Sequence, residues 1–227
     1  MFEKHFALAA AALMMSAGAC AQVGVTADIG TTGLGAHLVL PMETTLNGRF
    51  GFNYLTHDFS KTSDRVDYAI KGKLETIDVL FDWYLSEGSS FRLTGGVLYN
   101  GNRFSAEGRP GSNGTITLNG KVYASSAVGK LIGTIDYRKA APYVGIGWGN
   151  ALAPARGGNG GWRFNADAGV FYQGNSNVKL ENVGCGATAT ICTAIAGDVA
   201  AERARLQDDL GDFKLFPVIR ASISYGF

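Results

Sequence analysis

The sequence predicts an all-β protein, an eight-stranded antiparallel transmembrane β-barrel with a short helix in its last extracellular loop. Short segments in which every second residue is apolar recur along the 227 residues. Glycine, with 32 residues, is about twice as frequent as in an average protein, and charged residues make up only 17%. Aromatic residues gather at the ends of the alternating segments, as in the interfacial girdles of membrane barrels.

The N-terminal residues 1–21 are expected to be a signal peptide. An apolar run of about ten residues, Phe6 to Met15, has the length of a secretory core and is too short to span a membrane as a helix. Small residues then suit cleavage, so the barrel would occupy residues 22–227. The alternative is a lipoprotein in which Cys20 is the acylated first residue.

Alternation with period two predicts the strands in chain order. The first two alternate Val, Ala, Ile and Leu with Gly, Thr, Asp and His, and the third gathers Phe50, Phe52 and Tyr54 on one face. The second half of the fourth sets aliphatic and aromatic residues against Asp78 and Asp82. These four strands are Val23 to Thr31, Leu34 to Leu40, Leu46 to Leu55 and Val66 to Leu85.

The later strands repeat the pattern with more glycine. The fifth sets aliphatic residues against Arg92, the sixth ends in a run with glycine at alternate positions, and the seventh alternates aromatics and Ala with Arg163 and Asp167. In the eighth, apolar residues oppose Arg220 and two serines. These four strands are Phe91 to Arg103, Ile132 to Trp148, Trp162 to Gln173 and Phe213 to Phe227.

The connections between these strands alternate in length, as in outer-membrane barrels. Short turns at 41–45, 86–90 and 150–160 are expected on the periplasmic side, and the outer loops are 31–33, 56–65, 104–130 and 174–212. The polar face mixes Gly with Arg and Asp, a composition that suits a narrow, filled lumen better than a solvated surface. We therefore expect the apolar faces to meet lipid, in the cell outer membrane of a Gram-negative bacterium.

The C-terminal segment resembles the assembly signal of bacterial outer-membrane barrels, with alternate apolar positions and a final Phe. Those positions are Ile219, Ala221, Ile223, Tyr225 and Phe227. Segments 82–85, 91–100 and 141–150 are similar to small proteobacterial barrels of the OmpA-like, OmpX-like and OmpW-like kind. The resemblance implies the barrel-assembly machinery and outer-membrane lipid as partners, and it implies no single chemistry.

The two long outer loops are the expected site of contact with an extracellular ligand. Loop 104–130 contains Asn119-Gly120 between alternating arms, which predicts a hairpin. Loop 174–212 carries Cys185 and Cys192, which we expect to form a disulfide because the exported compartment is oxidising. The alternative, a metal or redox pair, lacks a neighbouring His or carboxylate and the usual close spacing.

Residues 196–211 are rich in helix formers and predict a short helix that rests on the barrel rim. A lid or a partner-binding helix is the alternative.

Eight charged residues are expected to face the lumen. In a barrel this narrow they must pair with one another, because each unpaired buried charge costs several kcal/mol. Pairing would plug the lumen, whereas a gated polar path lined by these residues is the alternative. The eight are Arg49, Arg92, Arg163, Arg220, Asp28, Asp78, Asp82 and Asp167.

The predicted function is that of a non-enzymatic barrel whose loops serve interaction or envelope structure. A narrow channel for small polar or amphipathic solutes is the first alternative, and a barrel-embedded lipid-modifying enzyme is the second. An enzyme would need a His beside a Ser or Asp. Of the histidines, His37 is expected to be an interior hydrogen-bonded imidazole and His57 a loop residue. We expect no cofactor or metal, and the net charge of +1 argues against a nucleic-acid partner.

Overall fold

The structure is a computed structural model, and it describes residues 23–62, 66–110, 114–152 and 161–227. The expected signal peptide, residues 1–21, and most of the expected turn 150–160 lie outside the described residues. In the described part, no helix has the length and apolar character needed to cross a membrane.

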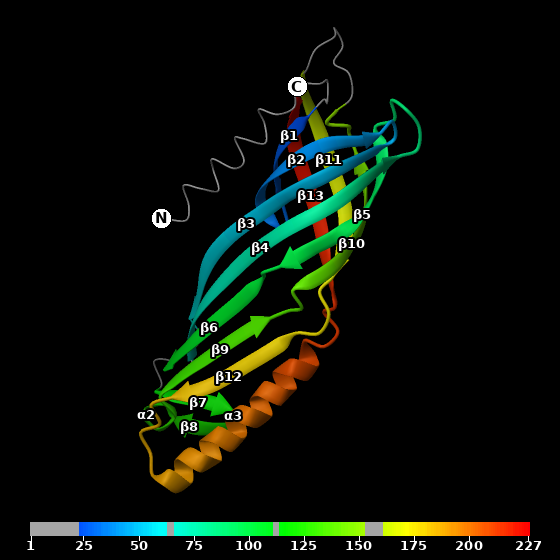
Figure 1. Cartoon of the computed structure of the whole chain (residues 1–227). Coiled ribbons are helices and arrows are strands. Elements are labelled where there is room, and N and C mark those ends of the chain that lie inside the picture. Colours follow the sequence, from blue (N-terminus) through cyan, green and yellow to red (C-terminus); the bar gives the residue numbers. More distant parts are fainter. Residues whose placement is uncertain (1–22, 63–65, 111–113, 153–160) are drawn as a thin grey trace, which may run out of the picture.

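Strands dominate the described residues and form one eleven-stranded sheet and one two-stranded sheet (Figure 1). The strands of the large sheet are β1 (Gly24–Gly30), β2 (Gly33–Glu43), β3 (Leu46–Thr62), β4 (Val66–Tyr84), β5 (Phe91–Asn100), β6 (Arg103–Pro110), β9 (Lys130–Asp136), β10 (Ala140–Trp148), β11 (Gly161–Tyr172), β12 (Asn177–Val183) and β13 (Leu215–Gly226). The remaining elements are β7 (Thr115–Leu118), β8 (Lys121–Ala124), α2 (Ser125–Val128) and α3 (Ala189–Asp209).

The sheet closes on itself through antiparallel pairs. The pairing runs from β1 through β2, β3, β4, β5, β10, β11 and β13 and returns to β1. The closure is uneven, because β5 pairs with Thr76–Tyr84 of β4 whereas the segment Val66–Lys73 pairs with β6. Strands β6, β9 and β12 then extend the sheet beyond the closed part. The result is an all-β barrel prolonged on one side.

We name the prolonged part the head. It comprises the described residues of 101–139 and 174–214, together with residues 56–62 and 66–75 of β3 and β4. The C-terminus lies at the opposite end of the barrel, which we call the terminal end (Figure 1).

The large sheet has eleven strands instead of the expected eight, because two expected strands divide and a further strand, β12, forms within an expected loop. The expected strand Phe91 to Arg103 breaks at Gly101, whose amide donates to the Glu75 carbonyl at 2.7 Å, and the Asn102 side chain accepts from the Glu75 amide at 2.9 Å. These bonds end β5 and start β6 along the same partner strand. The expected strand Ile132 to Trp148 divides into β9 and β10 at the matching level.

The expected outer loops are also more ordered than the sequence indicated. Strand β3 continues to Thr62 through the expected loop 56–65, because β4 pairs with it along that whole length. Strand β12 forms within the expected loop 174–212, where it pairs with β9.

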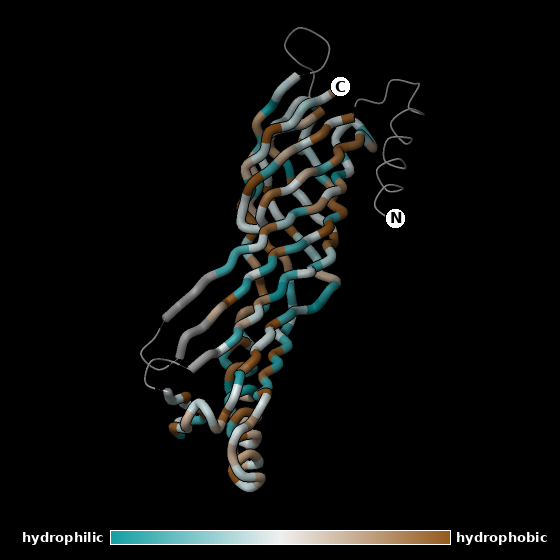
Figure 2. Tube along the Cα trace, turned by 90° about the vertical axis from the view of Figure 1, so that its left-hand side faces the viewer, coloured by the Kyte–Doolittle hydropathy of each residue, from teal (hydrophilic) through white to brown (hydrophobic). Residues whose placement is uncertain are grey.

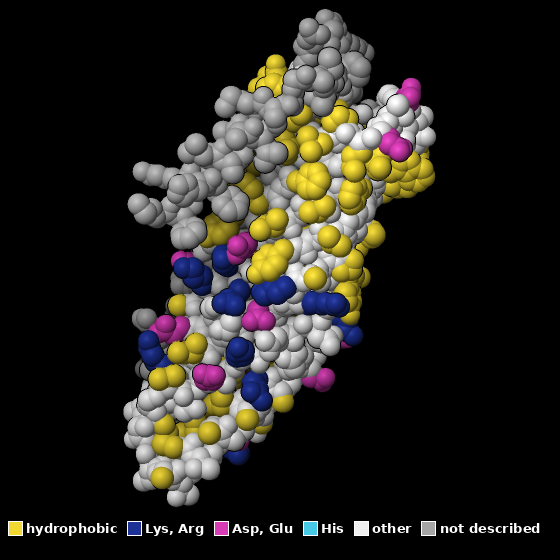
Figure 3. All heavy atoms as spheres, viewed as in Figure 1, with side chains coloured by type: hydrophobic (Ala, Val, Ile, Leu, Met, Phe, Trp, Pro, Cys, Tyr) yellow, Lys and Arg dark blue, Asp and Glu magenta, His cyan; other side chains and the backbone are white. Residues whose placement is uncertain are grey.

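In the barrel, the apolar faces point outward and the polar faces inward, as expected. Hydrophobic and hydrophilic residues alternate along its strands (Figure 2), and hydrophobic side chains gather on the upper part of the face that Figure 3 shows. Large exposed apolar side chains include Val25, Ile29, Phe50, Phe52, Ile77, Phe81, Trp83, Val97, Tyr99, Val144, Ile146, Trp148, Trp162, Phe164, Ile219 and Ile223. Such a belt is costly in water and favourable in lipid.

The head has a separate core beneath its sheet. The predicted hairpin is confirmed: Asn119 and Gly120 have φ of 49° and 75° and join β7 to β8. This hairpin packs with α2 and α3 around a buried apolar cluster. The cluster consists of Ile116, Leu118, Val128, Leu131, Ile195 and Val199.

The helix predicted at residues 196–211 is longer in the structure and begins earlier. Helix α3 starts at Ala189 and ends at Asp209, and it packs on the head instead of resting on the barrel rim. Its first turns contain β-branched Ile191 and Thr193 and lie close to Gly197, which weakens their local helix propensity. Burial of Ile195 in the head core compensates for this weakness.

Candidate functional site

The lumen contains two layers of buried charge, and the layer nearer the head surrounds a histidine. His37 Nδ1 lies 2.8 Å from Asp28 Oδ2, and its Nε2 lies 3.0 Å from Asp78 Oδ1. Asp78 also accepts from Arg220 and from Asn53, both at 3.2 Å. Side chains from β2, β3 and β13 thus meet the Asp78 carboxylate of β4: the His37 ring, the Asn53 amide and the Arg220 guanidinium.

The second layer lies nearer the terminal end and is built from two arginines and two aspartates. Arg49 donates to Asp167 at 3.1 Å and to Asp82 at 3.3 Å. Arg92 donates to Asp167 at 2.7 Å and also bonds the Gly149 carbonyl. Asp167 therefore bridges two guanidinium groups, and all four charged side chains are buried.

Glycines on the inner faces leave the space that these side chains occupy. A Cβ at Gly51 would lie 2.2 Å from His37 Cδ2, and one at Gly147 would lie 2.7 Å from Arg92 Cζ. Both distances are far below van der Waals contact, so a larger residue would displace the network. The high glycine content is thus partly a packing requirement of the filled lumen.

The structure places Arg163 apart from these two layers. Its guanidinium is half-buried and donates to the carbonyls of Ala151 at 3.2 Å and Gly161 at 3.0 Å. The position follows from its register: Arg163 pairs with Ser224 near the terminal ends of β11 and β13, four residues from Asp167 along its own strand. The predicted interior set is therefore brought together except for Arg163.

Apolar side chains fill the lumen toward the head. Phe171 and Phe216 stack with their ring centroids 4.8 Å apart, opposite one another on β11 and β13. The buried members of this cluster are Leu80, Leu98, Ala141, Tyr143, Phe171 and Val218. At the other side of the charged layers, a cavity of about 10 Å³ lies beside Arg49 and Arg92, which is room for one water.

The two histidines of the described residues lie in different surroundings. Both ring nitrogens of His37 already face carboxylates, and His57 is exposed on β3. Within the described ranges, no group of three or more His, Cys, Asp and Glu could hold a metal ion.

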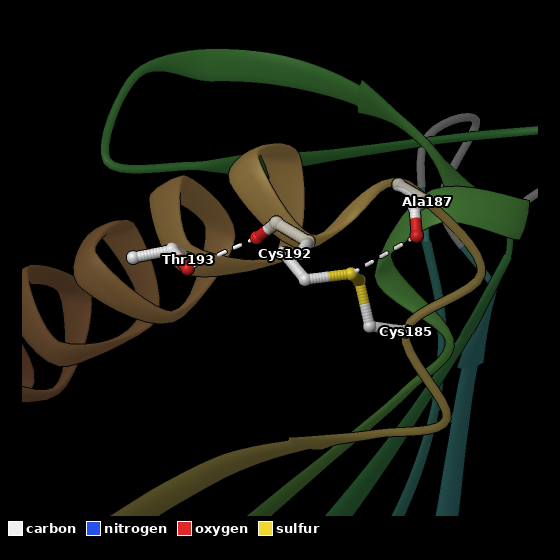
Figure 4. Close-up of a disulfide and its surroundings, with 5 residues drawn as sticks. Cys185, Ala187, Cys192 and Thr193 are labelled. Atoms are coloured by element: carbon white, nitrogen blue, oxygen red, sulfur yellow. Dashed lines mark hydrogen bonds between the residues drawn. A yellow bond between two sulfur atoms is a disulfide. The ribbon is translucent and has the colours of Figure 1, made fainter.

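The head contains the predicted disulfide, between Cys185 and Cys192 (Figure 4). The two Cα atoms are 6.0 Å apart, and the bond ties the segment before α3 to its first turn. Cys192 Sγ lies 3.5 Å from the Ala187 carbonyl oxygen, and Thr193 donates to the Ala189 carbonyl at 3.0 Å. The start of the helix is thus held covalently and by a side-chain hydrogen bond.

A polar cluster that the sequence analysis missed joins α3 to the β7–β8 hairpin. Asp198 accepts from Asn119 Nδ2 at 3.1 Å, from Lys121 Nζ at 2.9 Å and from the Tyr123 hydroxyl. The hydrogen bond from Tyr123, followed by those from Asn119 and Lys121, lowers the pKa of Asp198 to about 2. The sequence signal was a lone carboxylate in an Ala-rich and Ile-rich run of the helix.

Comparison with known proteins gives a fold and no family. No family model matches the chain, and no curated protein matches it. CarO of Acinetobacter baumannii has a TM-score of 0.57 and 20% identity, covering 91% of this chain and 98% of that chain. CarO2 of Acinetobacter baumannii has a TM-score of 0.59 and 18% identity, covering 92% of this chain and all of that one. A major outer membrane protein from Thermus thermophilus has a TM-score of 0.44 and 15% identity, with coverage of 92% and 100%. The likeness to the two Acinetobacter structures shows that this chain shares their all-β fold.

Proposed function

We propose that the protein is a non-enzymatic outer-membrane barrel that conducts no solute and displays its head outside the cell for interaction or envelope structure. The observation that carries this proposal is the filled lumen. Two layers of paired charges and an apolar cluster lie across it, and the described cavity between its walls holds about one water.

The outer surface supports a position in the outer membrane, with lipid as a partner. The exposed apolar belt faces outward on the barrel, and Lys and Arg side chains gather below it, on the side of the head (Figure 3). Lys73 lies over the Tyr54 ring at 5.9 Å, and Lys139 lies over the Tyr99 ring at 5.8 Å. Aromatic rings at a membrane interface with cations beside them suit anionic lipid headgroups. The start of β1 and the end of β13 would then face the periplasm.

The conduction test uses the purified protein in a planar lipid bilayer. We expect the wild type to show no steady open state, and Asp167→Ala to introduce leak because Arg49 and Arg92 lose their shared carboxylate. Asn165→Ala is the matched control. It removes an interior polar side chain two residues away, one that bonds Ser224 at 3.0 Å and takes no part in the described charge pairs.

Regular single-channel steps from the wild type, with an ion selectivity that changes in Asp167→Ala, would overturn the plugged lumen. They would favour the narrow channel instead. Hydrolysis of outer-membrane lipid that depends on His37 would favour the enzyme and would contradict the structural role given to its two carboxylate contacts.

We also propose that the C-terminal strand is the signal read by the barrel-assembly machinery. The Phe227 ring is 68% exposed and lies 4.9 Å from that of Tyr225, and β13 is the strand that closes the barrel against β1. Deletion of Phe227 should reduce the folded barrel recovered from cell membranes and leave refolding in detergent intact. Phe164→Ala, which removes an exposed ring from the neighbouring strand β11, is the matched control and should assemble normally. Equal yields from cells for the deletion and the wild type would contradict the signal.

A further inference from the structure

The concave face of the head sheet continues the inner face of the barrel, and it is apolar. The register aligns Ile70, Ala106, Gly133 and Leu180 in one row across β4, β6, β9 and β12. Because alternate residues of a strand share a face, the next row on the same face also crosses these four strands. That row consists of Gly72, Phe104, Ile135 and Val178.

The β7–β8 hairpin and α3 form the other walls of a hollow against this face. Ile116 and Leu118 line it from β7, and Leu206 and Glu202 line it from α3. The cavity measures about 410 Å³. Pockets of about 300–1,000 Å³ lined by apolar side chains with a few polar groups are typical of small-molecule sites.

Two small residues create the space. Ala106 and Gly133 face each other on neighbouring strands, where larger residues would meet in a packed core. A Cβ at Gly133 would lie 3.5 Å from Leu180 Cδ1 and 3.9 Å from Ala106 Cβ, which are ordinary contact distances. A Cβ would therefore fit at position 133 without a clash, so local crowding does not require glycine there. A longer side chain there would extend into the hollow.

Polar groups occur at the margin of the pocket. Glu202 already has a partner, since one of its carboxylate oxygens accepts a hydrogen bond from the backbone N–H of Asn119 at 3.2 Å. Lys179 also contributes to the lining, but it alternates with Val178 and Leu180 along β12, so its exposed side chain belongs to the opposite face of that strand. The ligand body must therefore be apolar and uncharged.

We propose that this pocket binds a small, uncharged, predominantly apolar molecule. The inference rests on the proposed function, which displays the head outside the cell and so exposes the pocket to external molecules. It adds a ligand class and a site to that function.

The test uses the full-length protein in lipid nanodiscs and a naphthalene that carries a photoreactive diazirine. After illumination, mass spectrometry locates the labelled peptides. We expect saturable labelling of the peptides that contain Phe104, Ile135 or Leu206, with competition by unlabelled naphthalene. Labelling of the lipid-facing belt should not saturate and serves as an internal reference.

The variant Gly133→Leu should fill the pocket and reduce the saturable labelling by about tenfold or more. Ile132→Phe is the matched control, because it adds bulk at the adjacent residue on the opposite face of β9, where the side chain is 42% exposed. Ala106→Leu fills the pocket from β6 and is a second variant if Gly133→Leu does not fold.

Absence of saturable labelling in these peptides of the wild type would overturn the pocket, as would full labelling in both filled variants. The result is separate from the conductance test. A non-conducting barrel without labelling refutes the pocket alone, and a conducting barrel with saturable labelling refutes the plugged lumen alone.

Discussion

Strand β4 passes through both regions of the molecule, and its two faces exchange character between them. In the barrel, Ile77 points outward and Asp78 inward. In the head, Lys71 and Lys73 occupy the outward positions, while Ile70 lines the concave face. The backbone alternates without interruption between these parts, because β3 pairs with β4 in a continuous register from Leu46 to Thr62.

The reversal shows that the surroundings, and not the strand, decide which face is apolar. Lipid around the barrel favours apolar outward side chains, so the charges move inside and must pair there. Around the head we infer water, which reverses the arrangement and allows an apolar interior. On the outward face of β4, the side chains change from charged to apolar between Glu75 and Ile77. In our proposal this change marks the outer edge of the membrane.

The largest effect is expected from the buried charges of the barrel. Asp167→Ala leaves Arg49 and Arg92 buried without their shared carboxylate and should lower the free energy of unfolding by about 3–5 kcal/mol. Urea unfolding in lipid vesicles measures it. The control Asn165→Ala removes one neutral hydrogen bond and should cost about 1–3 kcal/mol. If both variants lost the same free energy of unfolding, the charge pairs would not contribute more to the stability of the barrel than a neutral hydrogen bond.

A second prediction exchanges the character of the outward face of β4. Val79→Arg introduces a charge on the belt and should destabilise the barrel by about 2–4 kcal/mol. Lys71→Leu, eight residues earlier on the same face, should change stability by less than about 0.5 kcal/mol, because the side chain lies exposed on the head. Urea unfolding of both variants provides the measurement. If Val79→Arg unfolded like the wild type, the outward face of β4 at this position would not face lipid.

The sequence predicts the barrel better than the head, for a physical reason. Each barrel strand carries its own period-two pattern, which is a local signal, and the narrow lumen forces its few charges to pair. Strand β12 is short and forms only because β9 lies beside it. The break at Gly101 depends on bonds to Glu75 of another strand. The pocket depends on Ala106 facing Gly133, a relation that no local pattern contains.

A third prediction separates the stability of the head from that of the barrel. The disulfide closes a short loop, with Cys185 and Cys192 seven residues apart, and its loss should destabilise the head by roughly 2–3 kcal/mol in the chain-entropy description. In the double Cys→Ser variant, amide hydrogen exchange should accelerate in α3 and leave β1 and β13 unchanged. Faster exchange throughout the barrel would show instead that the two regions unfold as one unit.

The smallest effect concerns acid, and it should be confined to the contact between α3 and the hairpin. The groups that face Asp198 there are Tyr123, Asn119 and Lys121, and they lower the pKa of Asp198 to about 2 from its ordinary 3.8. A carboxylate with a lowered pKa stabilises the folded state above its unfolded pKa, and that contribution is lost as the pH falls from about 4 toward 2. We expect the carboxyl carbon resonance of Asp198 to titrate with a midpoint near 2. Lys121→Met should move the midpoint upward, because it removes both a hydrogen bond and a positive charge, whereas Lys130→Met, on the outward face of β9, should leave it in place. A midpoint near 4 in the wild type would mean that the hairpin does not hold α3 through this carboxylate, and the head would then depend on its apolar core and its disulfide alone.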